Sequence, residues 1–464
     1  MFIFPLIYVI SFFVAAREVI KGNRDGVLIF LIFGLSMYTT AMSVTFMLGL
    51  KTLIPFFQFF KEILILSTLL LNIASLKRRP KFHAIDFAIL LFLLYLIIYA
   101  ILPIGEQSFV NRLMALKSNG FFILVYFTGR LFDPKDVHIN KYFNYIILLT
   151  IAVGAVLVIE LIMYRQLQLF TGYTEYCYYY FNFEPDGLFG LSTTFDSDSG
   201  YRRFASFFTN PLEHAVSTLL ALSVILALYT TDDNKFKITN TGMLALCASF
   251  LSILFALSRA PLASYFIIIY AFALITHKTY ITKTIHLIFG LGAVYVIYQF
   301  LQFENNHSGL VAVLLNTVNF TDPSSIGHLE QWAEGIAAMI THPLGLGLGS
   351  SGRVAGSLGE NVGGENQFII IGVQTGIIAV LLYMYIYGMF IKTGLKWVKY
   401  LKGKERKVCM AVLLVKIGLF ISLLTSEVES SSYLSYLNWL LSGLFISMVM
   451  RPRETVKLSP AYDH

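Results

Sequence analysis

Charged residues are scarce in this chain, and their scarcity excludes a soluble globular protein. Lys, Arg, Asp and Glu make up 13% of the 464 residues, whereas hydrophobic residues make up 57%. Soluble domains keep about a quarter of their residues charged. A mean hydropathy of +0.71 over the whole length indicates that lipid, not water, solvates most of the surface.

Cysteines, a basic N-terminal start and linker sequences are also missing or rare. The three cysteines, Cys177, Cys247 and Cys409, lie in separate contexts, which indicates neither a disulfide framework nor a metal site. Residues 1–20 lack the basic start of a signal peptide, so we expect them to form the first span. Since Pro/Gly-rich linkers, low-complexity tracts and repeats are absent, we expect residues 1–464 to form one integral membrane domain.

The chain contains many long apolar runs with few charged residues. A bilayer core of about 30 Å needs about 20 apolar residues per helix. We therefore expect an all-α, polytopic membrane helix bundle with about thirteen transmembrane helices. The runs lie near residues 1–20, 26–49, 53–76, 85–104, 111–132, 142–164, 211–230, 238–258, 261–276, 284–302, 366–391, 407–426 and 433–450.

The basic residues fall in alternate connections, and Lys and Arg mark the cytoplasmic side of a membrane protein. This alternation predicts an N-terminus outside and a C-terminus inside. It also explains the net charge of +7 without a nucleic-acid partner and leaves the outer face acidic. The basic connections are Arg17/Lys21/Arg24, Lys77/Arg78/Arg79/Lys81, Arg130/Lys135/Lys141, Lys235/Lys237, Lys278/Lys283, Lys392 through Lys407, and Arg451/Arg453/Lys457.

Two outer connections are long, at residues 165–210 and 303–365, and loops longer than about 15 residues are usually functional or disordered. The first is rich in Tyr and Phe between residues 173 and 183. An aromatic belt at the membrane interface is the favoured interpretation, and stacking against sugar rings is the alternative. The second has apolar residues at helical spacing between Ile326 and Ile340, which predicts an amphipathic helix in the interface plane.

The glycine-rich stretch 343–349 follows that helix. Without a following Lys or a preceding strand it is not a Walker phosphate loop, so a turn re-entering the membrane is expected. Within span three, Lys61 and Glu62 are expected to neutralise each other.

Three outer arginines, Arg203, Arg259 and Arg353, are the candidate ligands of an anion. Singly, each is accounted for by snorkelling or ion pairing. Together at the outer lipid boundary, their planar guanidinium groups match the oxygens of a lipid pyrophosphate. Glu365 is the candidate general base, although an acid at a helix start also stabilises the helix dipole.

In three patches the sequence resembles the superfamily of O-antigen ligases and Wzy-type O-antigen polymerases. The first is Arg203 through Asn210-Pro211, with Ser206 in place of the family's Gly, and the second is Ser258-Arg259-Ala260. The third begins at Pro343–Gly347, continues with Glu365-Asn366, where the family has a His-Asn pair, and ends at Gly376 and Ala379.

The resemblance implies a fold like that of the GT-C membrane glycosyltransferases and inverting, metal-independent glycosyl transfer without a cofactor. It also implies a bacterial inner-membrane location with an extracytoplasmic active face. Expected partners are undecaprenyl-pyrophosphate-linked donor and acceptor glycans, membrane lipid and a protein that regulates chain length. The expected catalytic residues are Glu365, Arg203 and Arg259, and the expected substrate-binding residues are Arg353, Arg202, Asn210, Asn366, Tyr201 and His328.

Two departures from the family pattern favour a polymerase. Glu365 replaces the ligase-type histidine, and His328 replaces an arginine often found four residues before the loop tryptophan. A ligase that transfers the lipid-linked glycan to lipid A core or protein is the alternative. A flippase or transporter is the alternative outside the enzymes, but transporters usually show repeats and polar midplane residues.

Overall fold

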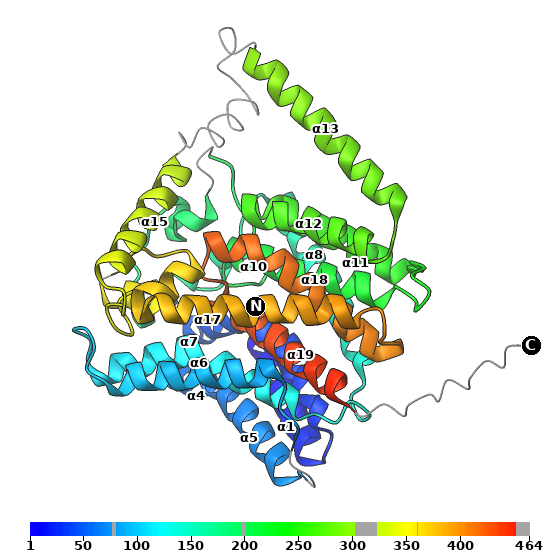
Figure 1. Cartoon of the computed structure of the whole chain (residues 1–464). Helices are drawn as coiled ribbons and strands as arrows, with labels where there is room; N and C mark the ends of the chain where they lie inside the picture. The colour runs from blue at the N-terminus through cyan, green and yellow to red at the C-terminus, as the bar shows by residue number, and fades with distance from the viewer. Residues whose placement is uncertain (77–79, 197–199, 302–322, 360, 452–464) are drawn as a thin grey trace, which may run out of the picture.

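The computed structural model describes residues 1–76, 80–196, 200–301, 323–359 and 361–451, and this part of the chain is helical without a β-strand (Figure 1). A helix or pair of helices covers each predicted apolar run. The helices are α1 (Ile3–Ile20), α2 (Val27–Ile29), α3 (Tyr38–Met47), α4 (Ile54–Gln58), α5 (Phe60–Ala74), α6 (Ala84–Ile101), α7 (Phe109–Arg130), α8 (Ile139–Met163), α9 (Tyr173–Phe181), α10 (Pro211–Leu228), α11 (Asn240–Phe255), α12 (Arg259–Ile275), α13 (Thr279–Leu301), α15 (Pro323–Thr341), α16 (Gly352–Leu358), α17 (Gln367–Trp397), α18 (Gly403–Thr425) and α19 (Ser432–Met450).

Eight helical segments among the described residues are long and apolar enough to cross a membrane. The pair Arg24–Gly34 and Tyr38–Met47, bent by 61°, makes a ninth if it is one span. Two further apolar helices, α11 and α12, are shorter, and the charged α7 is not among the eight. The polytopic helical membrane bundle is therefore confirmed, and the count of thirteen spans stays a prediction.

The bundle core is aromatic and closely packed where α7 crosses α19. The Phe122 and Trp439 rings stack with centroids 4.4 Å apart. Glycines let the two backbones meet, since a Cβ on Gly443 would lie 2.0 Å from the carbonyl oxygen of Tyr126. Small residues at helix contacts are how membrane helices gain close van der Waals packing.

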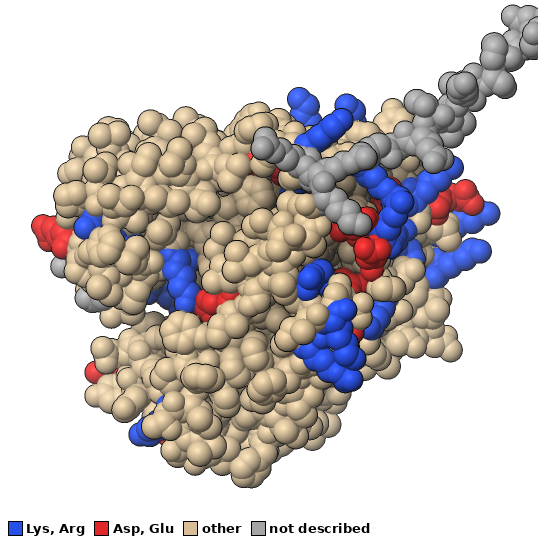
Figure 2. All heavy atoms as spheres, turned by 90° about the horizontal axis from the view of Figure 1, so that it is seen from below, with Lys and Arg blue, Asp and Glu red and all other residues tan. Residues whose placement is uncertain are grey.

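The basic connections gather at one end of the bundle, as the alternation of Lys and Arg predicts. Lys404 Nζ donates to the carbonyl oxygen of Lys135 at 2.7 Å, and Lys407 Nζ donates to Asn140 Oδ1 at 2.9 Å. The Gly403 amide donates to Asp232 at 2.9 Å. Figure 2 shows Lys and Arg side chains concentrated at one end of the visible face. Residues 77–79 and 452–464, which hold five of the predicted basic residues, lie outside the described ranges.

One buried charge pair and one partly exposed pair lie in the bundle. Arg130 Nε donates to both Asp86 oxygens at 3.1 Å, and the Tyr126 hydroxyl donates to the same carboxylate at 2.5 Å. The expected Lys61–Glu62 pair is wrong, because Glu62 instead forms an ion pair with Lys117 at 2.6 Å. Successive helix residues point about 100° apart, so adjacent Lys and Glu face different neighbours.

The glycine-rich stretch 343–349 forms backbone hydrogen bonds with α17 at a break in that helix. The backbone of Gly376 has φ +81°, which interrupts the helix and frees carbonyl groups. The Leu346 and Gly347 amides donate to the carbonyl oxygens of Val373 and Gln374 at 2.7 and 3.1 Å. A Cβ on Gly376 would lie 2.4 Å from the Pro343 carbonyl oxygen, so the contact requires glycine. The stretch therefore has a structural role, as a turn packed into the bundle.

Candidate functional site

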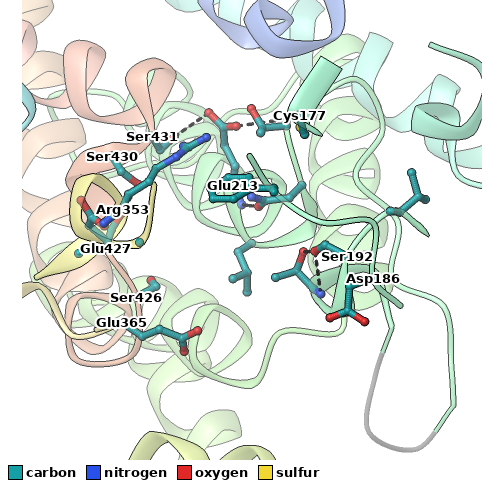
Figure 3. Close-up of a pocket in the computed structure, with 18 of the residues that line it drawn as sticks. Cys177, Asp186, Ser192, Glu213, Arg353, Glu365, Ser426, Glu427, Ser430 and Ser431 are labelled. Atoms are coloured by element: carbon teal, nitrogen blue, oxygen red, sulfur yellow. Dashed lines mark hydrogen bonds between the residues drawn. The ribbon is translucent and has the colours of Figure 1, made fainter. Parts of the chain in front are cut away.

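A cavity of about 530 Å³ (Figure 3) lies at the Thr425 end of α18, and the opposite end of this helix, at Gly403, adjoins the basic connections. Its walls come from both long connections, the start of α10 and the turn between α18 and α19. All these segments lie on the predicted outer side. The described lining residues include one cation, Arg353, and several carboxylates, which are Glu184, Asp186, Glu213, Glu365 and Glu427.

Arg353 is held by its backbone and projects its charge into the cavity. Its amide donates to Glu427 Oε2 at 2.7 Å, and its guanidinium carbon lies 5.9 Å from the Phe181 ring centroid. Figure 3 shows the side chain extending from α16 towards Ser431 and Glu213. Because the backbone, not the guanidinium, makes the structural bond, the charge is available to a ligand.

Glu427 forms the wall behind Arg353. Removal from bulk water raises the pKa of Glu427, while the amide hydrogen bond and the positive charge of Arg353 act in the opposite direction. Burial is the larger effect, so the carboxyl takes up a proton more readily than an exposed glutamate does.

Glu365 occupies a strained position at the cavity edge. Its φ of +83° is rare for a residue with a Cβ, and strain of this kind costs about 1–3 kcal/mol and collects at functional sites. Its carboxylate is about half exposed and lies 3.0 Å from Nδ1 of His328 on α15. Figure 3 shows Glu365 projecting into the open space of the cavity. The sequence predicted both residues, and the structure pairs them.

The two predicted asparagines have capping roles. Asn210 precedes Pro211 at the start of α10 and accepts a hydrogen bond of 2.8 Å from the Glu213 amide. Asn366 accepts from the Phe368 and Ile369 amides at the start of α17. Asn210 also lines the cavity, whereas the buried Asn366 does not.

Buried polar side chains hold the Arg203–Pro211 segment in place by hydrogen bonds to its backbone. Buried Glu160 accepts from the Ser206 amide at 2.9 Å, and Gln168 donates to the carbonyl oxygens of Ser206 and Phe208. Ser206 has φ +51°, a left-handed conformation in which glycine has no steric cost. This geometry gives a physical reason for the glycine of the motif that the segment resembles.

Arg203 and Arg259 come from neighbouring segments but are not among the described lining residues. The Phe204 amide donates to the Phe255 carbonyl oxygen at 3.1 Å, which sets the residue after Arg203 beside the end of α11. Arg259 opens α12 a few residues later. The structure thus brings the first two predicted motifs together, next to the cavity-forming connection rather than within its lining.

Arg202 and Tyr201 also lie away from the cavity lining. The Arg202 guanidinium stacks on the Tyr164 ring at 4.4 Å and on the Phe189 ring at 5.1 Å, and it donates to the Tyr164 carbonyl oxygen. Tyr201 is 66% exposed. Arg202 is therefore satisfied by local contacts.

The aromatic residues of the first connection divide between two environments. Tyr176 is buried against Phe46 of α3, with ring centroids 6.2 Å apart, so it belongs to the packed interior and not to an interfacial belt. Tyr179 is 58% exposed. Tyr173 and Phe183 line the cavity, where aromatic faces suit sugar rings.

Sequence reasoning missed the turn between α18 and α19. Ser426, Glu427, Ser430 and Ser431 all line the cavity. The polar run from residue 425 to residue 432, between two long apolar runs, was the available signal. Glu213 was missed as well, and its Oε1 accepts from the Ser431 hydroxyl at 2.9 Å.

Within the described ranges, no three His, Cys, Asp or Glu side chains are arranged to hold a metal ion. Part of the second connection, residues 303–322, lies outside those ranges. Comparison with known protein families and with curated proteins finds no match for this chain.

Proposed function

We propose that the chain is a glycosyltransferase that polymerises lipid-linked saccharide repeat units in the 530 Å³ cavity. The observation that carries the proposal is the placement of Arg353 and Glu365 around one cavity, between both long connections of a membrane bundle. A cation suited to a diphosphate and a carboxylate suited to a base are the two groups that metal-independent transfer from a lipid diphosphate requires. The resemblance to Wzy-type polymerases supports the same reaction.

In this reaction an acceptor sugar hydroxyl attacks C1 of the donor sugar. Glu365 accepts the hydroxyl proton, a new C1–O glycosidic bond forms, and the bond from C1 to the diphosphate oxygen breaks with inversion. Arg353 stabilises the departing lipid diphosphate, and such electrostatic stabilisation contributes about 3–4 kcal/mol per donor. His328, 3.0 Å from Glu365, orients the base. The resemblance assigns stabilisation of the departing diphosphate to Arg203 and Arg259 as well, and both lie outside the described lining of this cavity.

The proposal includes the finer topology. About thirteen spans, a GT-C-like fold, an outer N-terminus and a cytoplasmic C-terminus place the cavity outside the cytoplasmic membrane, where completed repeat units are exposed.

Chain extension by membranes carrying variant proteins tests the catalytic roles. Glu365→Gln and Arg353→Gln are each expected to slow extension by a factor of about 10² or more. Lys51→Gln, at an exposed lysine outside the cavity lining, is the matched control and retains activity. Undiminished extension by Glu365→Gln would contradict the assignment.

The lipid-linked glycans of a deletion strain distinguish the alternatives. A polymerase predicts that single repeat units accumulate on the outer leaflet. Accumulated lipid-linked polymer would indicate a ligase, and repeat units trapped at the inner leaflet would indicate a flippase.

A further inference from the structure

A second, smaller cavity adjoins the first and contains two cations. Its volume is about 190 Å³, which leaves room for several water molecules. Lys61 of α5 and Arg353 of α16 both line it. Thr209, Glu213, Arg353 and Ser430 line both cavities, so the two spaces are contiguous.

Neither cation has an ion-pair partner in the described part of the chain. Lys61 Nζ lies 4.2 Å from the Tyr38 ring centroid, and the adjacent Glu62 is occupied by Lys117. The Arg353 guanidinium contacts an aromatic ring, and only the backbone of Arg353 bonds to Glu427. Two unpaired like charges facing one small cavity repel each other, and an anion between them removes that repulsion.

Glu213 is the one carboxylate among the described lining residues of the second cavity, and both of its oxygens are already engaged. Oε1 accepts from the Ser431 hydroxyl at 2.9 Å, and Oε2 accepts from the Thr209 amide at 3.2 Å. It also lies in the first turn of α10, where an acid stabilises the helix dipole. The described lining of the second cavity therefore holds two positive side chains and one carboxylate that is already hydrogen-bonded, so its net charge is positive.

The other polar groups of the second cavity suit an oxyanion. Hydroxyl groups line it on α3, α9 and α19 and in the turns before α10 and α19; they belong to Tyr38, Thr39, Tyr176, Thr209, Ser430 and Ser432. The Thr39 and Thr209 hydroxyls hydrogen-bond to each other at 2.8 Å, and the Ser430 hydroxyl donates to the Glu427 carbonyl oxygen at 2.7 Å, so an anion would take these donors over from their present partners. Hydroxyls, an ammonium and a guanidinium together are the donors that bind phosphate oxygens. A pair of cations favours an anion that carries charge at two phosphorus centres over a singly charged one.

We propose that Lys61 and Arg353 bind the diphosphate of a lipid-linked substrate in the second cavity, with the saccharide extending into the first. The lipid-linked nature of the anion rests on the proposed function; the place of the anion does not. A third cavity of about 210 Å³ shares Lys61, Ser430 and Ser432 with the second and lies between α5, α7 and α19, where Glu62, Lys117 and Glu429 line it.

Binding measurements on the purified full chain in detergent test this site. The probes are inorganic pyrophosphate and a polyprenyl diphosphate in mixed micelles. The wild type is expected to bind both, in competition with each other. Lys61→Gln and Arg353→Gln each raise the Kd by about tenfold or more, a loss of about 1.4 kcal/mol or more. Lys61→Arg keeps the charge and retains most of the affinity, and Lys51→Gln changes nothing.

The outcomes separate this inference from the proposed function. An unchanged Kd in Lys61→Gln, with a wild-type melting temperature and a single size-exclusion peak, overturns the anion site even if chain extension depends on Glu365. Loss of binding in both variants, in a protein that extends no chain, overturns the proposed function and leaves the anion site standing. Binding of pyrophosphate but not of the polyprenyl diphosphate overturns the lipid-linked assignment.

Discussion

The Arg353 amide donates a hydrogen bond of 2.7 Å to Glu427 Oε2, which joins the second long connection to the turn between α18 and α19. This bond holds α16 against that turn at one wall of the cavity. The same bond leaves the Arg353 guanidinium directed at the cavity, beside the Glu427 carboxyl that lines it.

Glu427 gives a pH dependence of known sign. Burial raises the pKa of Glu427 in the folded protein, so the folded state binds more protons than the unfolded state above about pH 4. Its contribution to stability is therefore largest at low pH and is lost as pH rises through the raised pKa. Glu427→Gln removes this loss, so its melting temperature relative to wild type rises with pH. A difference that stays flat with pH contradicts the prediction; exposed Glu184→Gln controls for removal of a cavity carboxylate.

Gly376 and Gly388 form a matched pair of glycines on α17. Gly376→Ala places a Cβ 2.4 Å from the Pro343 carbonyl oxygen at a φ of +81°, and about 1–3 kcal/mol of destabilisation is expected. A Cβ on Gly388 meets nothing within 4 Å, so Gly388→Ala leaves stability unchanged or slightly raised. Thermal melts of the two variants in one detergent check the contrast. Equal stability of the two would show that the break does not need glycine.

Removing one partner of the buried Asp86–Arg130 pair is expected to destabilise the basic end of the bundle strongly. Arg130→Ala leaves an uncompensated charge on Asp86, which is 1% exposed, at a cost of about 3–5 kcal/mol. Exposed Lys135→Ala removes a charge nearby without a buried partner and serves as the control. The free energy of unfolding in denaturant measures both, and similar values for the two would refute the prediction.

The orientation of the chain can be tested with cysteines introduced into a cysteine-free variant. Lys51→Cys lies at the predicted outer end and Lys402→Cys at the basic end, and both positions are exposed. A membrane-impermeant maleimide is expected to label Lys51→Cys in intact cells and Lys402→Cys only after permeabilisation. The opposite pattern would reverse the predicted topology.

Much of the helical architecture could be predicted from the sequence because a membrane span leaves a strong local signal. An apolar run such as residues 139–163 must satisfy its own backbone hydrogen bonds, and in lipid that means a helix. The helix α15 could also be predicted from the sequence, since its apolar residues repeat at helical spacing. Local periodicity carries no information about the pairing of Glu62 with Lys117, which are 55 positions apart in the chain.

The site was predicted in part, and the reason is the same. Arg353, Glu365 and Asn210 line one cavity, because charged and polar residues at the ends of spans meet at the same end of the bundle, and their roles stay predictions. Arg202 was expected there too, but Tyr164 and Phe189 take up its guanidinium. Which residues the fold places beside an arginine depends on tertiary packing, and Glu427 was missed for that reason.

The break at Gly376 divides α17 into two parts, and the first part has a fixed length. Residues 367–375 form a half-helix of about 14 Å, closed at one end by Asn366 and at the other by the stretch 343–349. Glu365 stands at the far end of this half-helix. Inserting one residue into it would turn that carboxylate by about 100° and shift it by about 1.5 Å, whereas the same insertion after Gly376 would leave it in place.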